Sequence, residues 1–249
     1  MHDVRLEAAP VVAAFARALP SSVVGLYVGG SLATGDYRPG VSDIDAVALL
    51  DGPARRSARK ELVALHHGLE RVHLHGRALH CVYVPRDRSS APDRSHWTWA
   101  HSQLFRRPLS RVARAELLAD PVVVRGPAPS TWLPPMTPDD VREAARSELT
   151  GYWSRALRKR AIWRQDLYVD LGLTVWARAE AAIEDGVLIT KTEAIARLEG
   201  RGLPDGVVAG VRRRREGGGT ELSDAQRQER ADVVRGFLRT EVARLLAVR

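Results

Sequence analysis

The sequence predicts a two-part fold: a small α/β unit over residues 1–130, followed by an all-α helical bundle over residues 137–249. In the first half, short apolar runs of strand length alternate with stretches whose apolar residues have helical spacing. Beyond residue 137 the spacing is helical throughout. Between the halves, RGPAPSTWLPPMTPDD at 125–140 contains five prolines and one glycine, a composition typical of a linker.

The composition is that of a globular protein and not of a membrane protein. Hydrophobic residues make up 45% of the 249 positions, and no apolar run approaches the ~20 residues that span a bilayer. The segment 1–20 carries Asp3, Glu7 and Arg17 among its apolar residues, which favours an amphipathic helix over a signal peptide. The single cysteine, Cys81, lies in an apolar stretch that indicates a buried thiol. We therefore expect a cytoplasmic protein without membrane contacts, and a monomer.

The positive charge of the chain suggests nucleic acid as a partner to consider. The net charge is +8, and only three of the 38 basic residues are lysines. The arginines are scattered along the chain, and the one dense group, Arg212–Arg215, lies beside EGGG, as at a solvated helix end. Nucleic acid is therefore not the partner that we expect.

The first unit should contain a small sheet with flanking helices. VVGLYV at 23–28 is predicted as a buried strand that ends at two glycines, and Ser31 then opens a short helical turn. The remaining predicted elements are strands at 43–50 and 78–85, a short apolar run at 122–124, and helices at 54–70, 98–107 and 110–119.

The second unit should consist of long amphipathic helices. One begins at the Thr-Pro-Asp cap of residues 137–139. Two more are predicted at 162–184 and 223–247, each with one apolar face. The residues expected on these faces are Val169, Leu173, Trp176 and Ile183 in the first and Val233, Phe237, Val242 and Leu245 in the second.

Two aspartates interrupt the apolar strand at 43–50. Because side chains two residues apart in a strand point to the same face, Asp43 and Asp45 should project together, opposite Ile44 and Ala46. Two adjacent carboxylates repel each other unless a cation lies between them, and carboxylate oxygens suit Mg²⁺. The alternative is a pair of solvated aspartates at a strand end.

A glycine turn precedes these aspartates. Gly29, Gly30 and Ser31 lie at a strand-to-helix turn, where glycine allows close approach of the backbone and free N–H groups can bind an anion. A phosphate-binding turn next to a metal-binding pair is what a nucleoside triphosphate requires.

The string G-G-S, an eleven-residue gap and D-I-D on an apolar strand resembles the signature of the polymerase-β-like nucleotidyltransferase superfamily. The two-part layout is similar to its aminoglycoside adenylyltransferase branch, the streptomycin/spectinomycin enzymes. The resemblance implies ATP as substrate, Mg²⁺ held by Asp43 and Asp45, and contacts to the triphosphate from Gly29, Gly30, Ser31 and Ser42.

The resemblance extends to LTVWARAEAAIEDGVLITKTEAIARLEGRGLP, which is similar to the helical domain of that branch. There an arginine is followed by a lysine thirteen residues later, and here these residues are Arg178 and Lys191. The resemblance implies that both reach the nucleotide across an interdomain cleft. Without it, two solvated cations on a helix surface would be expected.

The family's third carboxylate, the general base toward the acceptor hydroxyl, is replaced by His80 in GRALHCVYV. A histidine could still accept the proton, since its ordinary pKa of ~6.5 suits general-base catalysis at neutral pH. The alternatives are that Glu70 or Asp87 reaches the site, that the helical unit provides the base, or that catalysis is weakened.

The implied activity is Mg²⁺-dependent transfer of AMP from ATP to a hydroxyl of a small acceptor, an aminoglycoside-type antibiotic, with release of pyrophosphate. Carboxylates and aromatic rings suit such a polycation, and the candidates are Trp163, Asp166 and Asp170. Two alternatives remain. The acceptor could be another small molecule or a protein, or a degenerate nucleotidyltransferase fold could bind nucleotide or nucleic acid without turnover.

Overall fold

The structure, a computed structural model, describes residues 5–53 and 58–247. Asp3 and the start of the helix predicted at 54–70 lie outside the described residues. The chain divides into two compact units, Met1–Met136 and Thr137–Arg249. No helix among the described residues is long and apolar enough to cross a membrane.

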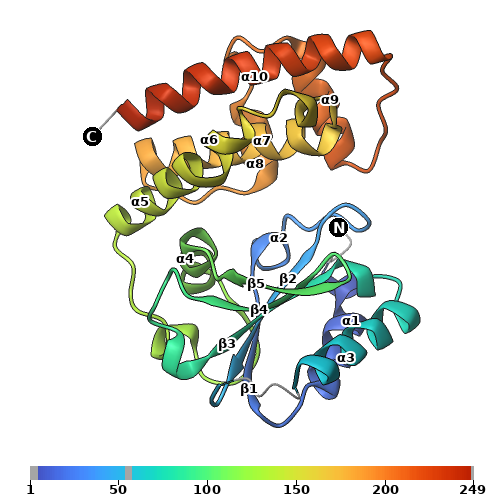
Figure 1. Ribbon diagram of the computed structural model, residues 1–249, viewed down its shortest axis with the longest axis vertical. Helices are drawn as coiled ribbons and strands as arrows, with labels where there is room; N and C mark the ends of the chain where they lie inside the picture. Colours follow the sequence, from blue (N-terminus) through green and yellow to red (C-terminus); the bar gives the residue numbers. More distant parts are fainter. Residues whose placement is uncertain (1–4, 54–57, 248–249) are drawn as a thin grey trace. The chain divides into compact units, whose positions relative to one another are not determined.

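The first unit is built on a six-stranded mixed sheet (Figure 1). Its order is β5-β4-β3-β2-β1-β6, and β2 and β3 are parallel, whereas every other neighbouring pair is antiparallel. The strands are β1 Val23–Val28, β2 Ile44–Leu50, β3 Leu79–Pro85, β4 Ser95–Ala100, β5 Gln103–Pro108 and β6 Val122–Arg125. The strands predicted at 23–28, 43–50 and 78–85 are therefore confirmed, as is the apolar run at 122–124.

Each face of the sheet has its own apolar core. Helices α1 (Arg5–Ala18) and α3 (Ala58–Val72) pack on one face, and α4 (Arg111–Ala119) lies on the other (Figure 1). Along β2, Ile44, Ala46, Ala48 and Leu50 belong to the first core, and Val47 and Leu49 to the second. Strand β2 therefore has the alternation that the sequence predicted. The short elements of the unit are α2 Gly30–Ala33 and the 3₁₀ turns Gly76–Ala78, Arg86–Arg88 and Pro129–Thr131.

The helix predicted at 98–107 is wrong. Residues 95–108 form the hairpin β4–β5, whose two-residue turn is His101-Ser102. In β4, Trp97 and Trp99 alternate with His96 and Thr98, a period of two that suits a strand. Aromatic and β-branched residues also favour strands over helices.

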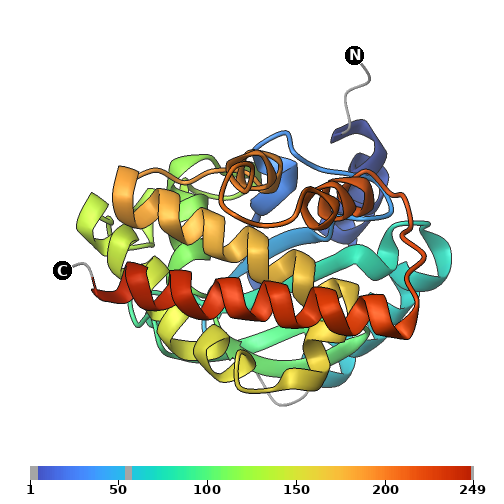
Figure 2. The same cartoon turned by 90° about the horizontal axis from the view of Figure 1, so that it is seen from above.

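The second unit is helical, and its core surrounds α7 (Asp166–Glu180). The helix α10 (Asp224–Ala247) packs against α7 and against the 3₁₀ segment Arg160–Arg164, and Figure 2 shows its full length. The predicted helix 162–184 is thus divided, because residues before Asp166 form the 3₁₀ segment. The other elements are α5 Pro138–Glu148, α6 Ser154–Ala156, α8 Lys191–Arg197, α9 Asp205–Arg215 and the π-helical turns Leu149–Trp153 and Ala181–Asp185.

Candidate active site

The glycine turn and the aspartate strand are in direct contact. The N–H of Gly29 donates a hydrogen bond to the carbonyl oxygen of Asp45 at 2.9 Å. Gly30 has a φ of +59°, and a Cβ added there would lie 2.7 Å from Oδ2 of Asp45. Only glycine accepts both the left-handed backbone and this close approach without strain. The two motifs, which eleven residues separate in the chain, therefore lie against each other.

Asp43 and Asp45 are both exposed at the start of β2. The side chain of Asp43 is 52% exposed, and its Oδ1 lies 3.6 Å from Nε2 of His80. Asp45 is the register partner of His80 across the parallel pair β2–β3. His80 thus lies beside both aspartates, on the face of the sheet to which Val47 and Val82 also belong.

His80 is nearly buried, with a side chain that is 8% exposed. Burial lowers the pKa of His80 below its usual range, the Asp43 carboxylate opposes this shift, and His101 and Arg107 reinforce it. The imidazole is therefore neutral at physiological pH, the form that can accept a proton.

The two alternative carboxylates predicted for this role lie elsewhere in the unit. Asp87 follows β3 at the end opposite to His80 and pairs with Arg88. Glu70 is part of α3, which packs on the other face of the sheet, and it pairs with His67 at 3.2 Å. Neither contacts the two aspartates in any described interaction, so His80 is the candidate base of the N-terminal unit.

The donor set of the site suits Mg²⁺. Among the described residues, no group of three or more histidine, cysteine, aspartate or glutamate side chains is arranged to hold a metal. Mg²⁺ does not need such a cage, because it binds through one or two carboxylates together with water and substrate phosphates. Asp43 and Asp45 are two exposed carboxylates beside the glycine turn. In that turn, Gly30 has no room for a side chain. These residues therefore fit the ion.

Ser31 and Ser42 differ in their surroundings. Ser31 lies in the first turn of α2 and is partly exposed next to Gly30. Ser42 is buried, and its Oγ accepts a hydrogen bond from the N–H of Arg38 at 3.0 Å, which closes the loop before β2. Its structural role is therefore clear, while its contact to a nucleotide stays a prediction.

Arg178 and Lys191 are both in the helical unit, on α7 and at the start of α8. The Nε of Arg178, on α7, donates to the carbonyl oxygen of Ile189 at 2.8 Å. Lys191 begins α8 directly after the N-cap Thr190, whose side chain accepts a hydrogen bond from the N–H of Glu193. The two cations predicted to bind nucleotide therefore lie on adjoining segments.

Trp163 was predicted to line an acceptor pocket, and this prediction is wrong. Its side chain is completely buried in the core of the helical unit. Its Nε1 donates to the carbonyl oxygen of Ala156 at 3.1 Å, and its ring fills the space above Gly172, where an added Cβ would be 2.6 Å away. The ring is therefore part of the core and does not line a pocket open to an acceptor.

Asp166 and Asp170 are held by arginines. Arg214 binds both oxygens of Asp170, at 2.5 and 2.8 Å, and burial raises the pKa of Asp170 in spite of these bonds. Asp166 is bonded to Arg230 and lies 3.7 Å from Arg227. Their role toward an acceptor stays a prediction, but each carboxylate already has a cationic partner.

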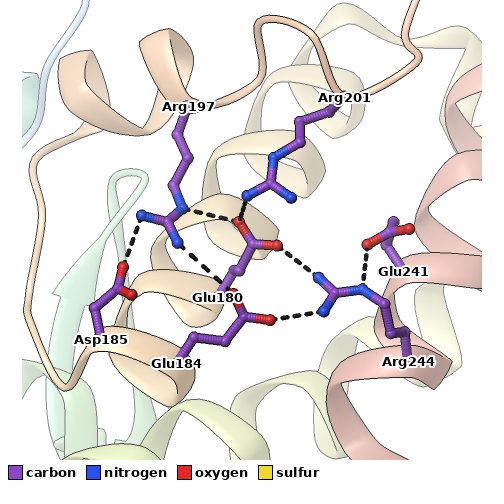
Figure 3. A network of polar contacts seen from close by, with 7 residues as sticks. All are labelled: Glu180, Glu184, Asp185, Arg197, Arg201, Glu241 and Arg244. Carbon is purple, nitrogen blue, oxygen red and sulfur yellow. Dashed lines mark hydrogen bonds and ion pairs between the residues drawn. The ribbon is translucent and has the colours of Figure 1, made fainter.

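A second charged network lies at the other end of α7 (Figure 3). The side chain of Glu180 is fully buried and bonded to Arg197, Arg201 and Arg244 at 2.5–2.8 Å. Glu184, Asp185 and Glu241 bind the outer sides of Arg197 and Arg244 (Figure 3). The network connects α7, α8 and α10, so its evident role is structural.

Sequence reasoning missed two residues close to His80. The ring of His101 lies 4.8 Å from the ring of His80, and Arg107 on β5 contributes to the lowered pKa of His80. A hairpin assigned to 95–108 would have placed His101 in its turn and Arg107 on its second strand, in the same sheet as β3. The signal that could have found them was the period-two alternation of SHWTWA.

Residues 11–96 match the family model described as a nucleotidyltransferase domain. The solved structure of spectinomycin adenyltransferase from Enterococcus faecialis, with ATP and spectinomycin, is similar to this chain with a TM-score of 0.70. The similarity covers 94% of this chain and 98% of that one, at 14% sequence identity. No curated protein sequence matches the chain. The predicted fold class, a small mixed sheet with flanking helices followed by an all-α unit, is confirmed, and the match to the nucleotidyltransferase domain lies within the first unit.

Proposed function

We propose, on the premise that the N-terminal unit contains a nucleotidyltransferase domain, that the protein transfers AMP from ATP to a hydroxyl of a small acceptor and releases pyrophosphate. The observation that supports this most directly is the contact between the Gly29–Ser31 turn and the face with Asp43, Asp45 and His80. It brings a glycine turn, a pair of carboxylates and a nearly buried histidine together in one place.

In this proposal each residue has a separate task. The backbone of Gly29 and Gly30 and the hydroxyl of Ser31 bind the triphosphate, helped by Ser42. Asp43 and Asp45 would hold Mg²⁺, which when bound neutralises phosphate charge and stabilises charge during in-line displacement. His80 takes the proton from the acceptor hydroxyl as the hydroxyl oxygen attacks the α-phosphorus. The bond from the α-phosphorus to the bridging oxygen breaks, and pyrophosphate leaves.

In this proposal two cations of the helical unit also bind the nucleotide. Arg178 and Lys191 carry the positive charges that would bind the phosphates or the nucleotide, and they lie on adjoining segments of that unit. The acceptor that we propose is an aminoglycoside-type antibiotic, because the structurally similar enzyme was solved with ATP and spectinomycin. Asp166 and Asp170 are the carboxylates that would receive its amino groups.

A second candidate function is nucleotide binding without transfer. The observation that favours it is His80, which stands where the family supplies a third carboxylate. A neutral imidazole is a weaker ligand for Mg²⁺ than a carboxylate, and it adds no negative charge to the site.

The test is pyrophosphate release from ATP and Mg²⁺ by the full chain, with and without a panel of aminoglycosides that includes streptomycin and spectinomycin. We expect release that depends on one drug and stops when the metal is chelated, with an adduct one AMP heavier in the mass spectrum. ATP binding without release for every drug would contradict an aminoglycoside acceptor. If other small molecules and proteins also gave no release, binding without transfer would be favoured.

A further inference from the structure

We propose that His101 is a positioning residue for His80, a role that rests on the proposed function. His101 holds the ring of His80, the proposed general base, in the orientation that meets the acceptor hydroxyl.

The turn between β4 and β5 has an unusual backbone for its residues. His101 has a φ of 53° and Ser102 a φ of 57°, and they are the only non-glycine residues with positive φ in the described part of the chain. Two-residue hairpin turns with two positive φ values strongly prefer asparagine, aspartate and glycine. The chain therefore keeps a histidine where glycine would be favoured by backbone energy. Such outliers are often retained for function.

The side chain at this position reaches the proposed base. The rings of His101 and His80 lie 4.8 Å apart, centroid to centroid, at an angle of 72°, which is an edge-on contact. His101 is exposed, whereas His80 is almost buried. The ring of His80 is therefore bounded by two side chains from different elements: Asp43, 3.6 Å from Nε2, and His101.

Orientation of the ring matters because a general base must come within hydrogen-bond distance of the proton that it removes. A ring that turns about its χ angles spends only part of its time in that geometry, and small misplacements cost large factors in rate. Removing His101 should therefore slow the chemical step and leave ATP binding nearly unchanged.

The chain offers a matched pair of variants. His101→Gly and Ser102→Gly both place glycine at a left-handed position of the same turn, and both should leave the fold at least as stable as in the wild type. Only the first removes the contact with His80. We expect His101→Gly to lower kcat by about 10- to 100-fold, with the KM for ATP within about twofold, and Ser102→Gly to change neither beyond about twofold.

Two further readouts separate positioning from a general loosening of the turn. Imidazole added to His101→Gly should restore part of kcat, because it can occupy the space left by the missing ring, and it should have no effect on Ser102→Gly. The ring-proton resonances of His80 should move in His101→Gly and stay in place in Ser102→Gly.

Equal kcat values for the two glycine variants, with unchanged His80 resonances, would overturn this inference while leaving the proposed transfer reaction intact. A wild-type protein that transfers AMP to no acceptor would instead overturn the proposed function, and the role of His101 in catalysis with it. The wild-type measurement therefore distinguishes the two failures.

Discussion

In the helical unit, the carboxylate of Glu180 is fully buried and bonded to three arginines, whereas in the N-terminal unit the carboxylate of Asp43 is half exposed beside His80. A buried carboxylate with several charge-assisted hydrogen bonds is saturated and has no capacity left for a ligand. An exposed carboxylate next to a second one can still bind a cation. The comparison separates a carboxylate that stabilises the fold from one that is available for chemistry.

The largest effect is expected at Asp43. Asp43→Asn removes half of the proposed metal-binding charge, so pyrophosphate release should fall by at least about 10³-fold, with the unfolding transition unchanged because the side chain is exposed. Steady-state kinetics and thermal unfolding measure the two quantities. The matched control is Asp51→Asn, an exposed aspartate directly after the opposite end of β2, which should retain full activity. Full activity in Asp43→Asn would contradict the metal assignment.

Glu180→Gln should lower the stability of the fold and leave pyrophosphate release nearly unchanged. The amide leaves three guanidinium groups without their shared anion, and we expect a loss of about 3 kcal/mol in the free energy of unfolding. The loss is limited because all three arginines are partly exposed and can be hydrated. Urea unfolding followed by far-UV circular dichroism measures it. A change below about 1 kcal/mol would show that the buried network contributes little net stability.

The buried imidazole of His66 should make the stability of the N-terminal unit depend on pH. His66 stacks on Trp99 at 4.7 Å, its Nε2 lies 2.7 Å from the hydroxyl of Tyr83, and burial lowers its pKa to about 3. The unfolded chain binds the proton first, near pH 6.5, so the stability contributed by neutral His66 is complete above that pH and is lost as the pH falls toward 3.

Between pH 7.5 and pH 5 this histidine alone should therefore cost the folded state about 2 kcal/mol. In His66→Gln the loss of stability over this range should be smaller by about that amount, as measured by urea unfolding at each pH. His96, whose pKa burial also lowers, to about 4, remains in both proteins and serves as the common background. An unchanged pH dependence in His66→Gln would contradict a neutral, buried His66.

The smallest effect is expected at the edge of the Glu180 network. Asp185 binds Arg197 at 2.8 Å, but its side chain is 47% exposed, so Asp185→Asn should change the free energy of unfolding by less than about 1 kcal/mol. The same urea titration as for Glu180→Gln measures it, and added salt should reduce the difference further. A loss as large as that of Glu180→Gln would mean that burial does not separate the two carboxylates.

Errors of the sequence analysis arise where packing partners decide the outcome. In α10 the prediction placed Val233, Phe237, Val242 and Leu245 on the apolar face, but Val233 is exposed and Val234 is buried in its place. The other three contribute to the core: Val242 and Leu245 are buried, and Phe237 is partly buried with its ring 4.9 Å from that of Trp176. The predicted helix at 98–107 failed for a related reason, since β4 is stabilised by its pairing with β3 and β5, and the edge strand β5 by its pairing with β4.

The sequence by itself determined the sheet with its helices, the helical second half, the glycine turn and the two-residue spacing of Asp43 and Asp45. These features depend on neighbours in the chain, through side-chain periodicity and the backbone freedom of glycine. Only the tertiary structure decided that Trp163 is buried, that Arg214 holds Asp170, and that His101 contacts His80. Such contacts join residues distant in sequence, and strand register and helix packing, which no local pattern encodes, bring them together.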